Sequence, residues 1–140
     1  MSIFATIDTN VLVSALLSKK SDTATVKIIK AVMDGDIIPL LHDDIISEYE
    51  DVLYRDKFHL RSSTIQTVIQ AFKTLGQWIF PKHTGETFIE PDDLIFYEVT
   101  MAKREDNSFL VTGNLRHYPN ADFIVTPAQM LAILKKSDNF

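Results

Sequence analysis

Residues 3–17 read IFATIDTNVLVSALL, an apolar run that is interrupted by a carboxylate at Asp8 and an amide at Asn10. The short apolar stretch FATID, which ends on an acid, is typical of a buried parallel strand that carries a polar residue at its carboxyl end. We therefore expect a strand over about residues 3–8 and a helix that starts about three residues later, with Thr9 or Asn10 as its N-cap. Asp8 is itself a candidate N-cap. The local sequence therefore leaves two roles open for it, as a helix cap or as a functional acid at the end of the strand.

The composition favours one folded domain over residues 1–140. At 46% hydrophobic content, with 4 Gly and 5 Pro, the chain has the apolar surface that a compact core needs. It contains no cysteine, which removes disulfides, thiolate metal sites and cysteine nucleophiles and fits a reducing, cytoplasmic location. The run over 3–17 lacks a basic leader and carries Asp8 at its centre, so we expect no membrane segment there.

Predicted strands and helices alternate along the chain. Strands are predicted over 3–8, 36–41, 78–80, 108–114 and 121–126, and helices over 22–35, 42–58, 62–76, 91–103 and 127–136. This order predicts an α/β fold with a parallel or mostly parallel sheet and helices on both of its faces. Pro39 counts against a central position for the second strand, because proline cannot donate a ladder hydrogen bond.

Acidic residues are predicted to meet at the carboxyl edge of this sheet. Asp8 ends the first strand, Glu48 lies one turn into the helix after the second strand, and Asp92 or Asp93 begins a later helix. Ligands of open α/β sheets bind at this edge, and several carboxylates from separate loops suit a hard divalent cation.

Periodicity alone does not choose among the neighbouring acids. Glu48 and Glu50 lie at opposite borders of one apolar helical stripe, so either can be the inward acid. The same arithmetic aligns Asp92, not Asp93, with the apolar side of the helix that begins at Pro91. Both aspartates also suit the positive end of a helix dipole, which is a structural alternative to a site role.

Five segments in this order resemble the PIN domain: IDTNVLVSALL, IISEYEDVL, EPDDLIFYEV, FLVTGN and VTPAQML. The chain looks most like small bacterial PIN proteins that are toxin components or standalone nucleases. The resemblance implies a three-layer α/β/α sandwich with a short, mostly parallel sheet. It also implies a metal-dependent ribonuclease that uses Mg²⁺ or Mn²⁺.

The resemblance assigns the catalytic and metal-binding acids residue by residue. Asp8 matches the first acid of the family and Glu48 the second. Asp93 matches the third, since Phe96 and Glu98 follow it as in the family motif, and this overrules the helical-wheel preference for Asp92. The supporting residues are then Asn10, Asp92, Thr112 and Asn114.

The chain departs from the family pattern after its VTG string. Where the family often carries a fourth aspartate, this sequence has Asn114 and then His117. An amide contributes an oxygen but no charge, so we expect weak binding of a second metal ion and low activity. Arg116 and His117 are the cations expected to contact the substrate.

The resemblance further implies single-stranded RNA as substrate, an antitoxin protein as partner, and a homodimer. The net charge of −5 is the wrong sign for general coating of nucleic acid, but it is compatible with metal-mediated contact to phosphates. The alternative function is a PIN-like module that binds RNA or protein without cleaving, because its set of acids is incomplete.

Overall fold

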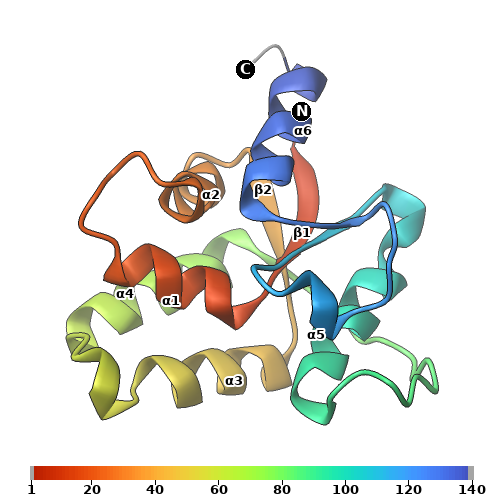
Figure 1. Ribbon diagram of the computed structural model, residues 1–140, viewed down its shortest axis with the longest axis horizontal. Coiled ribbons are helices and arrows are strands. Elements are labelled where there is room, and N and C mark those ends of the chain that lie inside the picture. Colours follow the sequence, from red (N-terminus) through yellow and green to blue (C-terminus); the bar gives the residue numbers. More distant parts are fainter. Residues whose placement is uncertain (1, 139–140) are drawn as a thin grey trace.

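A computed structural model describes residues 2–138 of the chain (Figure 1). Its centre is a five-stranded sheet in the order β3-β2-β1-β4-β5, in which every neighbouring pair is parallel. The strands are β1 (Ile3–Ile7), β2 (Ile37–Leu41), β3 (Gln77–Trp78), β4 (Phe109–Val111) and β5 (Ile124–Val125). The strand β1 lies in the middle, so the residue that follows it emerges at the centre of the sheet edge.

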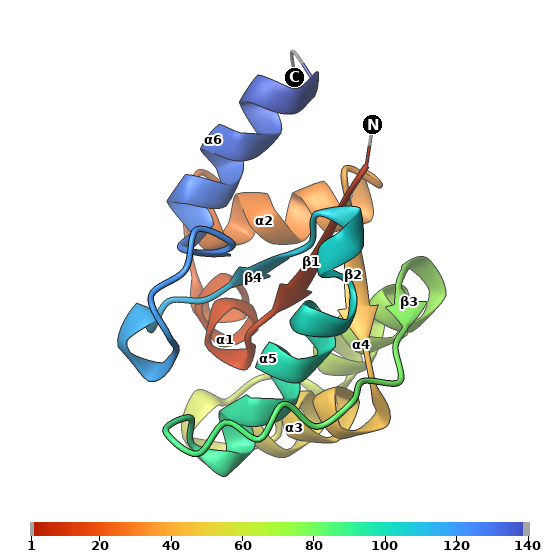
Figure 2. The same cartoon turned by 90° about the vertical axis from the view of Figure 1, so that its right-hand side faces the viewer.

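Helices cover both faces of the sheet. They are α1 (Thr9–Leu17), α2 (Ala24–Met33), α3 (Asp43–Leu53), α4 (Ser62–Leu75), α5 (Pro91–Ala102) and α6 (Pro127–Asp138), with 3-10 turns η1 (Asp56–Phe58), η2 (Arg104–Asp106) and η3 (Leu115–His117). Figure 1 shows α1, α2 and α4 on one side of β1 and β2, with α5 on the other. In Figure 2 α5 lies in front of the sheet, where it contacts β1, β2 and β4. The predicted α/β/α architecture is confirmed.

Most helix starts and stops follow local signals with small shifts, but the helix predicted over 42–58 ends at Leu53 and is followed by the 3-10 turn η1. Asp8, not Thr9 or Asn10, is the N-cap of α1, so this helix begins two residues earlier than predicted. Gly35 takes a φ of 84° just after α2, a backbone conformation that glycine adopts without strain. Pro91 occupies the first turn of α5, as its sequence indicated.

The expectation that Pro39 keeps β2 away from the sheet centre is wrong. The strand β2 is paired on both sides, with Pro39 opposite Ala5 of β1. Proline is tolerated because β3 pairs only with Leu40 and Leu41, one residue further on. Just before β3, a Cβ on Gly76 would lie 2.7 Å from the Pro39 carbonyl oxygen, so only glycine lets this backbone approach so closely.

An aromatic cluster under α3 and α5 connects the core to the end of β1. The ring of Tyr49 lies 5.9 Å from that of Phe72 and 6.1 Å from that of Phe96, between centroids. The Tyr49 hydroxyl donates a 2.6 Å hydrogen bond to the carbonyl of Ile7, so a buried side chain holds the residue before Asp8. Among residues 2–138, no helix has the length and apolar content needed to cross a bilayer.

Candidate functional site

A cavity of about 450 Å³ opens at the carboxyl edge of the sheet. Three acids from three elements line it: Asp8 after β1, Glu48 on α3 and Asp93 on α5. Its other polar lining residues are Thr9, Asn10, Ser14, Arg55, Asn114 and His117. The structure therefore brings the three acids that the sequence singled out to one cavity.

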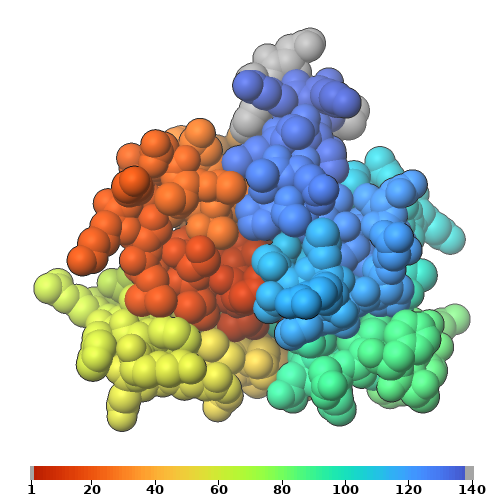
Figure 3. Space-filling model, viewed as in Figure 1, coloured from red at the N-terminus to blue at the C-terminus, as the bar shows by residue number. Residues whose placement is uncertain are grey.

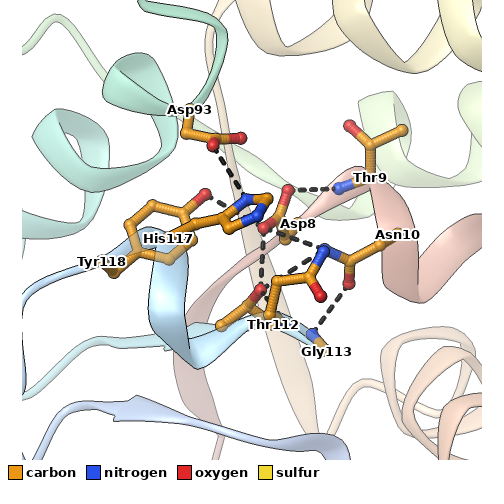
Figure 4. Close-up of polar contacts among 9 residues, drawn as sticks. Asp8, Thr9, Asn10, Asp93, Thr112, Gly113, His117 and Tyr118 are labelled. Carbon is orange, nitrogen blue, oxygen red and sulfur yellow. Dashed lines mark hydrogen bonds and ion pairs between the residues drawn. The ribbon is translucent and has the colours of Figure 1, made fainter. Parts of the chain in front are cut away.

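Asp8 is the most enclosed of these acids, at 3% exposure. The backbone continues the sheet here, because the Asp8 N–H donates to the Val111 carbonyl at 2.9 Å. One carboxylate oxygen, Oδ1, accepts from the Thr9 N–H at 2.8 Å. The other, Oδ2, accepts from the hydroxyls of Thr112 at 2.8 Å and Tyr118 at 3.0 Å (Figure 4). Asp8 is thus both a helix cap and a wall of the cavity.

Asn10 ties Asp8 to the loop after β4 (Figure 4). Its Nδ2 donates to Asp8 Oδ2 at 3.2 Å, while its Oδ1 accepts from the Gly113 N–H at 2.8 Å. The Thr112 hydroxyl accepts from the Asn114 N–H at 3.0 Å. Of the four predicted supporting residues, Asn10 and Thr112 therefore contact Asp8 directly, and the backbone N–H of Asn114 is linked to it through the Thr112 hydroxyl.

The two neighbouring aspartates of α5 lie differently. Asp93 lines the cavity, and its Oδ2 lies 3.2 Å from His117 Nδ1. Asp92 is exposed and does not line the cavity, which agrees with the choice made from the resemblance and not with the helical wheel. In the first helical turn, the direction of a side chain depends more on how the chain enters the helix than on which face of the helix is apolar.

On α3 the structure separates the two glutamates that periodicity could not. Glu48 lines the cavity and Glu50 does not. Just beyond the end of α3, Arg55 also lines the cavity, and its Nη2 lies 3.3 Å from Asp51 Oδ2. Arg55 is a cavity cation that sequence reasoning missed, because only the path of the chain after α3 turns it toward the acids.

Burial raises the pKa values of all three cavity acids, and nearby negative charge adds to the rise at Glu48 and Asp93. Burial is the main cause at Asp8, where hydrogen bonds from Thr112 and Tyr118 partly oppose the rise in pKa. At Asp93 burial and the charge of Asp8 raise the pKa, while His117 lowers it. At Glu48 burial and the charge of Asp92 raise the pKa. Asp92 therefore acts on the site through its charge without lining it.

The donor set fits a hard divalent cation. Oxygen ligands from several acids are what Mg²⁺ and Mn²⁺ prefer, and a nearby cation would relieve the repulsion. Thr9, a residue of 6% exposure, lines the same cavity, and its buried Oγ1 has no hydrogen-bond partner within residues 2–138. In the same residues, no three His, Asp or Glu side chains lie close enough to hold an ion together. Mg²⁺ needs only one or two carboxylates when water completes its shell.

One predicted substrate contact lies outside the acid cavity, and one contact to Asp8 was not predicted. Arg116 does not line the acid cavity but a second cavity on the other side of η3. Tyr118 was not singled out at all, although its hydroxyl contacts Asp8. Asp8 and Tyr118 are 110 positions apart in the chain, and no local pattern around Tyr118 marks it as a partner of an acid.

A family model described as PIN domain matches residues 5–116. The chain belongs to the PIN domain family. PIN domains are typically nucleases, and they usually use divalent metal ions. No curated protein and no solved structure matches the chain in the corresponding comparisons.

The match to the PIN domain includes all three cavity acids and ends at Arg116. Tyr118 lies just beyond the matched residues, although it contacts the first acid. The hydrogen bond to Asp8 is therefore a feature of this chain that the family match does not assign.

Proposed function

We propose that this PIN domain is a metal-dependent endoribonuclease that cleaves single-stranded RNA. The observation that carries the proposal is the convergence of Asp8, Glu48 and Asp93 on one open cavity, where burial raises the pKa of each acid. Buried acids with raised pKa values are expected where a cation or a reacting group completes the site.

The shape of the cavity supports a single strand as the substrate. Asp8 is almost completely enclosed, so a phosphate must enter the cavity to approach it. A flexible single strand can present a phosphate in this way, whereas a duplex keeps its phosphates on a stiff helical surface. The preference for RNA rests on the family resemblance.

Asp8, Glu48 and Asp93 would hold Mg²⁺ or Mn²⁺ directly or through water, and the ion would supply an activated water and neutralise charge on the phosphoryl oxygens. The side chains of Thr112, Tyr118 and Asn10 keep the Asp8 carboxylate in one orientation through their hydrogen bonds. Arg55 brings positive charge to the cavity lining, and His117 adds an imidazole ring to it; both would orient the phosphate.

The test is cleavage of a labelled single-stranded RNA during titration with Mn²⁺ or Mg²⁺. We expect wild-type protein to cleave only with metal, and Asp8→Ala protein to lose cleavage while it stays folded. Glu98→Gln is the matched control, since Glu98 is an equally buried acid at 4% exposure outside the cavity. Duplex RNA and single-stranded DNA of the same sequence test the substrate class. Cleavage that survives in Asp8→Ala would contradict the proposal.

A non-catalytic RNA-binding module is the second candidate. It is favoured by the absence of a three-donor cluster within residues 2–138 and by Asn114, which brings no charge where the family often has an aspartate. Wild-type protein that binds the RNA in a gel-shift assay, yet leaves it intact at every metal concentration, would favour this candidate.

On the resemblance alone, we propose that the protein acts as the toxin of a pair whose antitoxin covers the acid cavity, and that it forms a homodimer. Induced expression of wild-type protein should slow bacterial growth, and Asp8→Ala should not. Sedimentation of the purified protein tests the dimer.

A further inference from the structure

The chain after β4 forms a thin wall between two cavities. Asn114 and His117 line the acid cavity, whereas Leu115, Arg116 and Tyr118 line a second cavity of about 300 Å³. In a 3-10 turn, residues three apart lie on the same side. Asn114 and His117 therefore lie on one side of η3, and Leu115 and Tyr118 lie on the other.

Tyr118 connects the two sides of this wall. Its hydroxyl donates to Asp8 Oδ2 at 3.0 Å, and its side chain lines the second cavity. Figure 3 shows the light-blue segment that contains η3 on the molecular surface, directly beside the red surface of α1. Residues of the same 3-10 turn therefore line both cavities, one cavity on each side of the turn.

The second cavity combines an apolar lining with two polar groups. Tyr118 and Ile124 are buried at 7% and 6% exposure, and Pro119 and Ala121 continue the apolar lining. Arg116 and Asn120 are exposed, and neither side chain has a hydrogen bond or ion pair within the described part of the chain. Such a lining suits a flat heteroaromatic ring with polar edges.

We propose that the second cavity binds the base of a nucleotide whose phosphate enters the acid cavity. Single-stranded RNA is recognised by bases that stack on flat side chains or guanidinium groups and hydrogen-bond through their edges. The Arg116 guanidinium supplies a stacking plane, and the Asn120 amide supplies a donor and an acceptor for a base edge. The role in RNA cleavage rests on the proposed function, but the base-binding cavity does not depend on metal.

The first experiment uses adenosine, cytidine, guanosine and uridine, which carry no phosphate, with metal-free protein. Each nucleoside is titrated into ¹⁵N-labelled protein, and amide shifts are followed by NMR. We expect saturable shifts at the amides that line the second cavity, namely those of Leu115, Arg116, Tyr118, Asn120 and Ala121, with at least one nucleoside at millimolar affinity. No shifts at these residues with any nucleoside, or shifts confined to the acid cavity, would overturn the proposal.

Two exposed amides provide matched variants. Asn120→Ala should weaken nucleoside binding at least about fivefold, as expected for the loss of one hydrogen bond. Gln70→Ala, on the exposed face of α4, should leave binding unchanged. Equal nucleoside affinities in the two variants would show that Asn120 does not contact the nucleoside and would contradict the proposed recognition.

The cleavage assay then separates this inference from the proposed function. Asn120→Ala should raise KM for RNA and relax the base preference beside the cleavage position, with kcat retained. If RNA is not cleaved by wild-type protein, the nuclease proposal fails, and the nucleoside titration still decides whether the base-binding cavity exists.

Discussion

Asp8 and Glu98 are two carboxylates buried to nearly the same degree, at 3% and 4% exposure, yet their surroundings differ. Glu98 Oε2 accepts a 2.7 Å hydrogen bond from the Thr84 N–H, and its Oε1 lies 3.5 Å from His83 Nδ1. It therefore anchors the segment that precedes α5. Asp8 accepts hydrogen bonds just as fully but shares its cavity with two other acids.

The comparison teaches that burial of a charge does not by itself mark a functional site. A buried carboxylate that accepts hydrogen bonds from a loop has a sufficient structural explanation. Repulsion among the acids of one cavity has no such explanation within the fold, because the protein gains nothing from it until a cation or substrate arrives. Four predictions test this contrast, in order of decreasing effect.

The largest contrast concerns catalysis. Asp8→Asn should lower metal-dependent RNA cleavage by at least about 100-fold, because charge stabilisation by a bound metal contributes several kcal/mol to the transition state. Glu98→Gln should keep cleavage within about twofold of wild type. Initial rates at saturating Mn²⁺ measure both, and a large loss in Glu98→Gln would break the comparison.

A second contrast concerns the donors to Asp8. Tyr118→Phe should weaken Mn²⁺ binding about tenfold, because partners that orient a metal ligand commonly contribute this much. Tyr49→Phe is the matched control, since its buried hydroxyl donates to the Ile7 carbonyl and not to an acid. Both variants should lose about 1 kcal/mol of stability. Isothermal titration calorimetry and thermal melts measure the two effects, and equal Mn²⁺ affinity in both variants would contradict this role of Tyr118.

A third prediction concerns the anchoring role of Glu98. Glu98→Ala should cost about 1–3 kcal/mol, since it leaves the Thr84 N–H without its charged acceptor. Faster amide exchange at Thr84 and faster proteolysis between Pro81 and Glu90 are the expected signs. Unchanged exchange at Thr84 would show that this hydrogen bond does not hold the segment.

The smallest effect concerns pH and stability. Burial and Asp92 raise the pKa of Glu48 in the folded state, so the folded protein binds a proton more tightly than the unfolded chain. The resulting penalty is absent below the unfolded pKa of about 4.3 and complete above the folded pKa. Glu48→Gln should therefore stabilise the protein at pH 7 by less than about 1 kcal/mol and have no effect below about pH 4. Thermal melts across this pH range check the sign, and a stabilisation that grows toward low pH would contradict it.

Local sequence signals are sufficient to predict the alternation of strands and helices, the parallel sheet, and the position of Asp8 at the end of β1. These follow from signals within a few residues of each other: apolar periodicity, Gly35 after a helix and Pro91 at the start of one. The motif order added the PIN domain resemblance, which the family match confirms. The catalytic roles of Asp8, Glu48 and Asp93 stay predictions.

Which side chains share a cavity depends on how distant segments pack together. The fold places Glu48 in the acid cavity and Glu50 outside it. It also places Arg116 in the second cavity, on the far side of η3. It also brought the Tyr118 hydroxyl to Asp8 across 110 residues, because the pairing of β1 with β4 aligns the chain after both strands. Periodicity specifies which face of an element is apolar. The direction of a polar side chain at a strand or helix end depends instead on the register and path of distant segments.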